Sequence, residues 1–184
     1  MFAIVDGKKV VKYPTDPRYD FPHVSFPENW QGGEIEGVRY VIVDRVEQPN
    51  EIDGWSIQED QPEFINGVLT QKWKHNFLGF DYFKRLIAER RYMAEICGLI
   101  IDGIEIQTDR DSQTKYSIMA LNGYTEVNWK LKNGKFAVIN VKKVNKKVLD
   151  KIQKCFNREK ELLNIIDKND IEELKKIDLS RGWF

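Results

Sequence analysis

The sequence is poor in the residues that most often carry chemistry. It has two cysteines and two histidines among 184 residues. Cys97 and Cys155 are too few for a disulfide framework, and both lie among apolar residues of expected helices, so we expect them to be small core side chains. His23 and His75 lie far from either cysteine along the chain, and no cysteine pair has metal-ligand spacing. We therefore expect neither a Cys–His nucleophile nor a metal or other cofactor.

Long apolar runs, net charge and catalytic motifs are lacking as well. No run approaches the roughly 18 apolar residues of a membrane helix, and the first residues lack the pattern of a signal peptide. Lys and Arg number 29, as do Asp and Glu, so no overall field favours nucleic acid. There is no Gly-rich phosphate loop, His-Glu-x-x-His or Gly-x-Ser-x-Gly motif. We expect a soluble, cytoplasmically made protein that is not an enzyme.

What the chain does contain is typical of a folded α+β protein. Aromatic residues at 12% and hydrophobic residues at 41% favour a packed core over disorder. Turn dipeptides between β-forming residues predict four hairpins, at Asp6-Gly7, Asn66-Gly67, Asp102-Gly103 and Asn133-Gly134. With two-residue loops, the expected cross-strand pairs are Phe2–Val11 and Ala3–Val10, Ile101–Ile104 and Leu99–Ile106, and Leu131–Phe136 and Trp129–Val138.

Residues 1–75 are predicted to form a small β-rich unit. Further strands are expected at Val38–Val43, Trp55–Ile57 and Glu63–Thr70, with a turn at Gln31–Gly33 and a polar break at Pro49–Gly54. Within this unit the segment 13–30 has four prolines, which exclude a helix or a central strand, so we expect an extended arm or loop. Its ring side chains are Tyr13, Tyr19, Phe21, His23, Phe26 and Trp30. The rings either pin the arm onto its own domain or dock on a partner or a neighbouring subunit.

Residues 76–184 are predicted to form a helix–hairpin–helix–hairpin–long helix module. The first helix spans residues 81–97, and its apolar face comprises Phe83, Leu86, Ile87, Met93, Ala94 and Cys97. The long helix spans about residues 145–168, and its apolar stripe comprises Val148, Ile152, Cys155, Phe156, Leu162, Leu163 and Ile166. A last helix from Asn169 or Asp170 to about Leu179 leads to the tail residues Trp183 and Phe184. The two hairpins are expected to join into one small sheet.

The lysines of the long helix allow two interpretations. Lys143, Lys147, Lys151 and Lys154 share one helical side, which is the geometry of a phosphate-binding stripe. They lie opposite the apolar stripe, however, where a solvated polar face is expected. We favour the solvated face, and we expect neither nucleic acid nor membrane as a partner.

The stretch Thr108-Asp109-Arg110-Asp111-Ser112-Gln113 is predicted to start the middle helix. Thr108 or Asp109 can cap the first turn, followed by acidic or small residues. Capping explains the Asp109/Asp111 carboxylates with fewer assumptions than acid–base chemistry does. Asp109 is also placed to pair with Arg90 or Arg91, and Arg110 to face a partner.

This stretch is also the centre of a resemblance to a known family. Its companions are the Arg-rich helix before it (Arg85, Arg90, Arg91, Ala94, Glu95), the Gly98–Ile106 hairpin, Trp129-Lys130 and the run Cys155-Phe156-Asn157-Arg158-Glu159. Together, over about residues 84–167, they resemble a domain of unknown function found at the C-terminal end of bacteriophage tail-fibre and tail-fibre-assembly proteins. Tyr13-Pro14 with Val24-Ser25-Phe26-Pro27 also resembles the opening of phage tail-fibre-associated proteins.

The resemblance implies a structural protein of a tailed-phage virion, attaching or adapting fibres to the tail or baseplate. Its partners would be other tail proteins, in a homo- or hetero-oligomer. Docking would use Tyr13, Tyr19, Phe21, Phe26, Trp30, Trp183 and Phe184. Two alternatives stay open: a fibre-assembly chaperone absent from the finished particle, and a phage nucleic-acid-binding or host-modifying protein.

Overall fold

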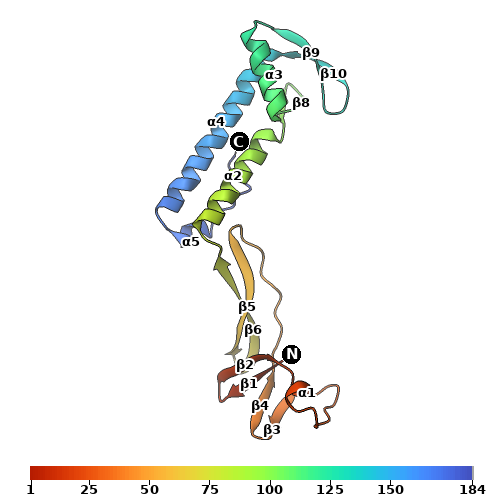
Figure 1. The fold of residues 1–184 in the computed structure, drawn as a ribbon, viewed down its shortest axis with the longest axis vertical. Coiled ribbons are helices and arrows are strands. Elements are labelled where there is room, and N and C mark those ends of the chain that lie inside the picture. Colours follow the sequence, from red (N-terminus) through yellow and green to blue (C-terminus); the bar gives the residue numbers. More distant parts are fainter. Residues whose placement is uncertain (184) are drawn as a thin grey trace. The chain divides into compact units, whose positions relative to one another are not determined.

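The chain is mixed α and β, with strands in its first part and a long helix in its second. The structure is a computed structural model, and it describes residues 1–183. The chain divides into two compact units, Met1–Phe77 and Leu78–Phe184, which we call unit 1 and unit 2. Figure 1 labels most of their elements.

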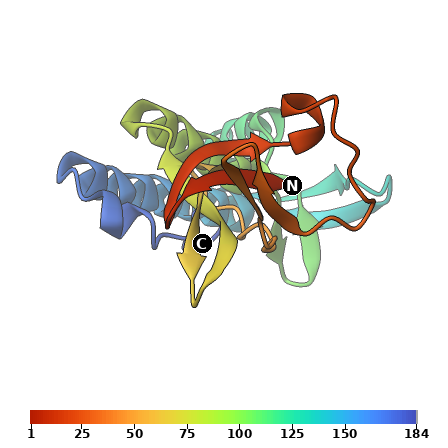
Figure 2. The same ribbon diagram turned by 90° about the horizontal axis from the view of Figure 1, so that it is seen from below.

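Unit 1 is built on a four-stranded antiparallel sheet. Its strands are β1 (Phe2–Asp6), β2 (Lys9–Thr15), β3 (Gly32–Ile35) and β4 (Val38–Ile42), in the order β2-β1-β4-β3. Figure 2 views these strands from below. The buried side chains Ala3 and Val5 of β1 pack with Val43 and Leu69 on one side of the central strands. On the other side, the buried Phe2 and Tyr40 pack with the Trp30 ring. The short helix α1 (Pro17–Asp20) follows β2 and lies within the segment 13–30, for which we expected no helix. It forms because Pro17 is at its first position, where a missing N–H costs no hydrogen bond.

The first hairpin forms, but its predicted register is wrong. Asp6 pairs with Lys9, so the loop is Gly7-Lys8 and not Asp6-Gly7, and irregularities further along bring Phe2 opposite Thr15. Gly7 has a positive φ of 58°. Moving the loop by one residue and adding bulges changes every later pair, so neither Phe2–Val11 nor Ala3–Val10 occurs.

A further hairpin, β3–β4, lies where we expected only a turn at Gln31–Gly33. Its loop is Glu36-Gly37, and both residues have positive φ. Glutamate is not a usual residue for this conformation, so the sequence gives little signal for the turn. Gly32 is required in the strand, because a Cβ there would lie 2.6 Å from the Tyr40 carbonyl oxygen on β4.

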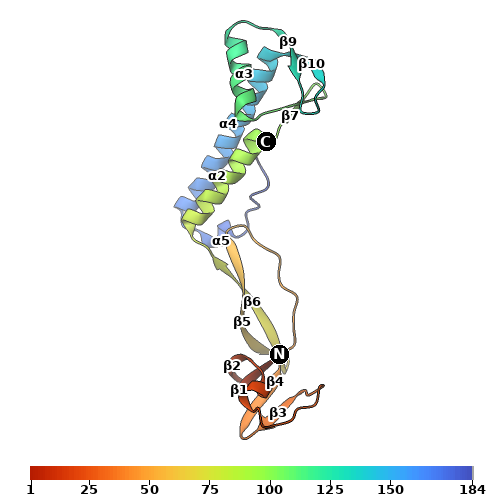
Figure 3. The same ribbon diagram turned by 45° about the vertical axis from the view of Figure 1, so that its right-hand side comes forward.

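The predicted Asn66-Gly67 turn closes the longest hairpin of unit 1. Strands β5 (Trp55–Ile65) and β6 (Val68–Phe77) form a two-stranded ribbon, visible in Figures 1 and 3. The ribbon is longer than predicted because β5 continues past Pro62, where a register shift between Asp60 and Glu63 accommodates the proline.

Unit 2 contains three main helices and two hairpins. Its elements are α2 (Phe80–Ile96), β7 (Leu99–Ile101), β8 (Ile104–Ile106), α3 (Arg110–Leu121), β9 (Glu126–Lys130), β10 (Phe136–Asn140), α4 (Val141–Asp167) and α5 (Ile171–Leu174). Helices α2 and α3 both pack against α4, and α2 runs beside α4 in Figures 1 and 3. A core cluster under α3 and α4 comprises Ile101, Ile106, Tyr116, Ile139, Val144 and Val148.

The hairpins of unit 2 confirm one predicted register and contradict the other. Leu99 pairs with Ile106 and Ile101 with Ile104, as predicted. In the second hairpin Trp129 pairs with Ala137 and not with Val138, because residues 132–134 form a three-residue loop with Gly134 at a φ of 82°. The hairpins also remain two separate two-stranded sheets instead of joining into one.

Several predicted faces of the helices need correction. On α2, Phe83, Ile87 and Ala94 are buried, whereas Met93 and Cys97 are exposed. Cys155 is buried as expected, so the core prediction holds for one cysteine and fails for the other. On α4, Phe156 is exposed, and Lys151, which we placed on the solvated side, is buried.

The ends of the last helices also differ from prediction. Helix α4 begins at Val141, four residues earlier than expected, because Asn140 caps it by accepting a hydrogen bond from the Lys143 amide. Asp170 caps α5 as expected, but α5 ends at Leu174 instead of continuing to Leu179. Leu174 and Leu179 are both buried, so the chain after α5 packs on unit 2 in non-helical form.

Candidate functional site

Asp109 is the N-cap of α3, as the sequence predicts. Its carboxylate accepts hydrogen bonds from the Ser112 amide (3.0 Å) and the Ser112 hydroxyl (2.7 Å). These bonds lower the pKa of Asp109 against the opposing effect of burial. The carboxylate therefore serves the helix start, while Asp111 faces solvent.

Thr108 and Gln113 tie the start of α3 to the end of α2. Both side chains are buried. The Gly98 amide donates to the Thr108 hydroxyl oxygen at 2.9 Å, and the Gln113 amide nitrogen donates to the Thr108 carbonyl at 2.6 Å. Their hydrogen-bonding groups are thus used inside the fold.

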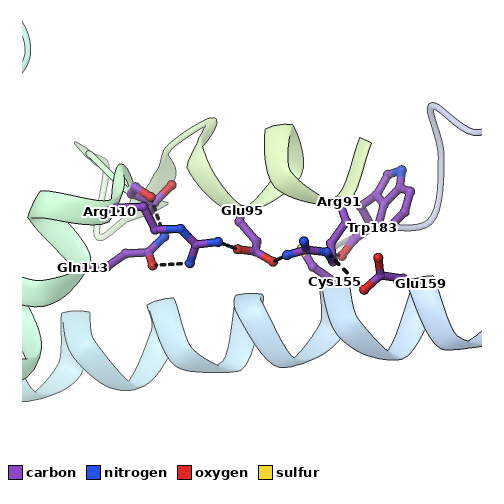
Figure 4. Close-up of polar contacts among 8 residues, drawn as sticks. Arg91, Glu95, Arg110, Gln113, Cys155, Glu159 and Trp183 are labelled. Carbon is purple, nitrogen blue, oxygen red and sulfur yellow. Dashed lines mark hydrogen bonds and ion pairs between the residues drawn. The ribbon is translucent and has the colours of Figure 1, made fainter. Parts of the chain in front are cut away.

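Glu95 is the centre of the network, and sequence reasoning did not single it out as a site. Its side chain is fully buried on α2 and accepts hydrogen bonds from two arginines, which Figure 4 shows on either side of it. Arg91 lies one turn earlier on α2 and donates to one carboxylate oxygen. Arg110 donates to the other oxygen at 2.6 Å and, through its second amino group, to Gln113 at 3.2 Å.

Arg91 extends the network to α4. Its Nε lies 3.1 Å from a Glu159 carboxylate oxygen, and its guanidinium carbon lies 5.0 Å from the centre of the Phe156 ring. Burial acts to lower the pKa of Arg91, but Glu95 and Glu159 outweigh it and raise the pKa. Two arginines and two glutamates balance, so the network of Arg91, Glu95, Arg110 and Glu159 has no net charge.

The remaining motif residues also make contacts within unit 2. Trp129 packs against Tyr116 with ring centres 4.5 Å apart and ring planes tilted by 44°, and its indole nitrogen donates to the Gln107 side chain at 3.2 Å. The thiol of Cys155 is 3.6 Å from the Trp183 carbonyl. Burial raises the pKa of this thiol, which makes it a poor nucleophile.

This arrangement holds α2, α3 and α4 together but offers no chemistry that we can assign. Each charged group of the network faces a group of opposite sign, and no histidine takes part. No cluster of three or more metal-ligating side chains occurs within residues 1–183. We interpret the network as a structural brace, with α3 aligned by its capped start.

The arm residues of unit 1 mostly contact their own unit. Trp30 has its ring centre 5.1 Å from those of Phe2 and Phe26, and Phe21 lies edge-on to Tyr40 at 6.2 Å. Of the two interpretations, packing on the chain's own domain is thus observed for these rings. The Tyr13 hydroxyl donates to Glu59, and burial together with this carboxylate raises the pKa of Tyr13 to about 12. Tyr19 is exposed.

The tail docks on unit 2 as far as it is described. Trp183 is buried, and its indole nitrogen donates to the Leu179 carbonyl at 2.7 Å. This corresponds to docking of the tail on its own domain. Phe184, the other tail residue predicted to dock on a partner, lies outside the described residues.

Sequence reasoning missed several exposed apolar side chains of unit 2. Phe136 and Val138 lie two residues apart on β10 and are 69% and 61% exposed, and Leu121 and Tyr124 are exposed at the end of α3. What the sequence did not reveal is the length of the loop after Leu131. A loop of three residues, in place of the expected two, turns Phe136 and Val138 outward. These side chains are available to a partner, unlike those of the network.

Unit 2 is thus an α+β module whose three helices are held by a buried ion-pair network. The chain belongs to the family described as a domain of unknown function (DUF4376), which matches residues 83–180. No curated protein and no solved structure showed a significant match. Every helix within residues 1–183 is too short or too polar to span a membrane.

Proposed function

We propose that this chain is a non-enzymatic structural protein of a tailed-phage virion, which attaches or adapts fibres to the tail or baseplate. The resemblance of residues 84–167 to domains of phage tail-fibre and fibre-assembly proteins supports this context. In this proposal unit 2 is a helix–hairpin–helix–hairpin–long helix docking module. Its partners are other tail proteins, with which it forms a homo- or hetero-oligomer in the virion tail.

The observation that carries the proposal is the exposed apolar face of β10. Phe136 and Val138 point to the same side of the strand, beside Lys130 and Asn128 of β9. Large apolar side chains grouped in a polar rim are typical of protein–protein contact sites. We call Phe136 and Val138 the apolar face of β10.

Most of the residues that we expected to dock on a partner already have contacts within the chain. Phe21, Phe26 and Trp30 already contact rings of unit 1, and Trp183 is buried in unit 2. Of the arm, Tyr19 is the ring most available to a partner. Docking through the other arm rings stays a prediction, whereas the apolar face needs no rearrangement to make contact.

Quantitative mass spectrometry of purified, intact particles tests the placement in the virion. A fixed ratio of this chain to known tail proteins is expected. Its absence from particles, combined with abundance in the lysate of infected cells, would refute the virion role and favour the assembly chaperone.

Two double variants test the apolar face. Phe136→Ser with Val138→Ser should lower incorporation into particles, because both side chains would be buried at the contact. Val11→Ser with Val68→Ser is the matched control, since these exposed valines lie on unit 1. Circular dichroism checks that both proteins fold. Normal incorporation of the folded Phe136/Val138 variant would remove the apolar face from the proposal.

A further inference from the structure

A groove in unit 2 lies between β7 and the first half of α4, and we call it the lysine groove. Its volume is about 690 Å³. Leu99, Ile100, Ile101 and Asp102 line one side, and Lys143, Lys147, Lys151 and Lys154 line the other. From the sequence we expected these lysines to form a solvated face, but in the structure the apolar residues of β7 lie alongside them.

The four lysines of the groove are not equally engaged. Lys143 pairs with Asp102 at 2.6 Å, and the buried Lys151 donates to the Gly98 carbonyl at 2.5 Å. Lys147 and Lys154 make no ion pair or hydrogen bond within residues 1–183. Two ammonium groups beside the groove are therefore available to carboxylates from elsewhere.

Helix stability does not account for this clustering of positive charge. Lys143, Lys147 and Lys151 are four residues apart, so neighbours of like charge repel along α4. Lys143 also lies in the first turn of α4, where the helix dipole favours acidic residues, and that turn has none. An external anionic partner would turn this unfavourable arrangement into a favourable one.

The other side of the groove is apolar and presents backbone groups. The side chain of Ile100 is 74% exposed. In a hairpin closed by a two-residue loop at Asp102-Gly103, Ile100 and Glu105 form a pair that exchanges no hydrogen bonds. The N–H and C=O of Ile100 therefore point away from β8, toward the free edge of β7. An extended peptide can use such an edge.

These features fit a protein segment better than a nucleic acid. Four lysines and the two carboxylates of Asp102 and Asp150 leave the lining with two net positive charges, which match the few carboxylates of a short segment better than a polyphosphate backbone. The groove lining contains no aromatic ring for base stacking and no arginine. The chain as a whole has no net positive charge to attract a polyanion.

We propose that the lysine groove binds an extended segment of a partner protein that alternates acidic and apolar residues. Carboxylates of the segment reach Lys147 and Lys154, and an apolar side chain covers Ile100. This proposal concerns a surface other than the apolar face of β10, and it does not depend on a place in the virion.

Fluorescence polarisation with the full chain tests the proposal. The probe is a labelled short peptide of alternating glutamate and valine; its comparisons are a lysine–valine peptide of the same length and a single-stranded oligothymidine. Lys147→Glu with Lys154→Glu reverses the charge at the groove. Lys142→Glu with Lys146→Glu is the matched control, because these two lysines lie on the same half of α4 but do not line the groove.

We expect the glutamate–valine peptide to bind more tightly than either comparison probe. The groove variant should weaken its binding about tenfold, since two exposed ion pairs are replaced by repulsion, and the control variant should leave it nearly unchanged. Ile100→Ser should also weaken it, including at high salt, where ion pairs contribute least.

Other outcomes overturn the proposal. Equal losses of affinity for the glutamate–valine peptide in the groove and control variants would mean that this peptide is attracted by the overall charge of α4 and not by the groove. Tighter binding of the oligothymidine, lost in the groove variant, would assign the groove to nucleic acid. Binding of the glutamate–valine peptide no stronger than that of its lysine counterpart would show that the groove does not select acidic segments. Circular dichroism excludes misfolding as the cause of a loss.

Discussion

Replacing Glu95 with leucine removes the carboxylate that holds Arg91 and Arg110 together. Glu95 is fully buried between α2 and α4. Leucine is similar in size and apolar, so the variant removes the charge without leaving a large cavity. The change therefore isolates the electrostatic part of the network.

The expected cost follows from how far each arginine can reach water. Removing one partner of a buried ion pair typically costs about 3–5 kcal/mol. The Arg110 side chain is 51% exposed and can be rehydrated, but that of Arg91 is only 19% exposed and keeps Glu159 and the Phe156 ring as partners. We therefore expect about 3 kcal/mol for Glu95→Leu, at the lower end of that range.

Two further single variants allow the expected losses in free energy of unfolding to be ranked. Arg91→Leu removes a positive charge beside Glu95 and Glu159. It should lower the free energy of unfolding about as much as Glu95→Leu does. Arg110→Leu removes a half-exposed partner while Arg91 still neutralises Glu95, so about 1 kcal/mol is expected. The double variant Glu95→Leu with Arg91→Leu should cost less than the sum of its single variants, because neither charge is then left unpaired.

Urea unfolding of the full chain measures these free energies, and hydrogen exchange in peptides of α2 and α4 confirms that unit 2 is affected. Val68→Ser replaces an exposed side chain of unit 1 and is the control. It should alter neither the free energy of unfolding nor the hydrogen exchange of α2 and α4. A cost below about 1 kcal/mol for Glu95→Leu, or strict additivity with Arg91→Leu, would refute the reasoning that the pair is a buried brace.

Three other predictions follow from single groups. Hydrogen bonds from Lys12, Thr15 and Tyr40 lower the pKa of Asp20 from 3.8 to about 2. The contribution of Asp20 to stability is therefore present above pH 4 and is lost as the pH falls toward 2. Asp20→Asn should flatten this part of an acid-unfolding curve. A thiol-specific reagent should label exposed Cys97 in the native protein but buried Cys155 only after unfolding, as read by mass spectrometry of the labelled peptides. Trp183→Ala should destabilise unit 2 by about 3–5 kcal/mol in urea unfolding, because a buried ring and its hydrogen bond to Leu179 are lost.

Local sequence signals locate most elements but fix only some of their registers. The four turn dipeptides all lie at or beside hairpin loops, because glycine after Asn or Asp allows positive φ. At Asp102-Gly103 a two-residue loop forms and the predicted pairs follow. At Asn133-Gly134 the same kind of dipeptide ends a three-residue loop. The dipeptide does not distinguish the two loop lengths, and the difference decides whether Phe136 is inward or outward.

Burial of charged residues depends on contacts that are distant in sequence. Glu95 carries a charge, and its partner Arg110 comes from the next helix, so the sequence of α2 alone gives no reason to expect this carboxylate to be buried. Lys151 was assigned to solvent because it is off the main apolar stripe of α4. Since α2 and α3 both pack on α4, the buried arc of that helix is wider than one stripe and includes Lys151.

The residues that carry the family resemblance are engaged in holding unit 2 together. Asp109 caps α3, Arg110 and Glu159 neutralise the charges around Glu95, and Trp129 packs on Tyr116. A motif used in this way specifies the fold in which it occurs, and it leaves the partner unspecified. In the two proposals made above, recognition depends instead on exposed residues outside the motif, namely Phe136 and Val138 on β10 and Lys147 and Lys154 beside the lysine groove. Substitutions there should change what the protein binds while leaving its stability nearly unchanged, whereas substitutions in the network should do the reverse.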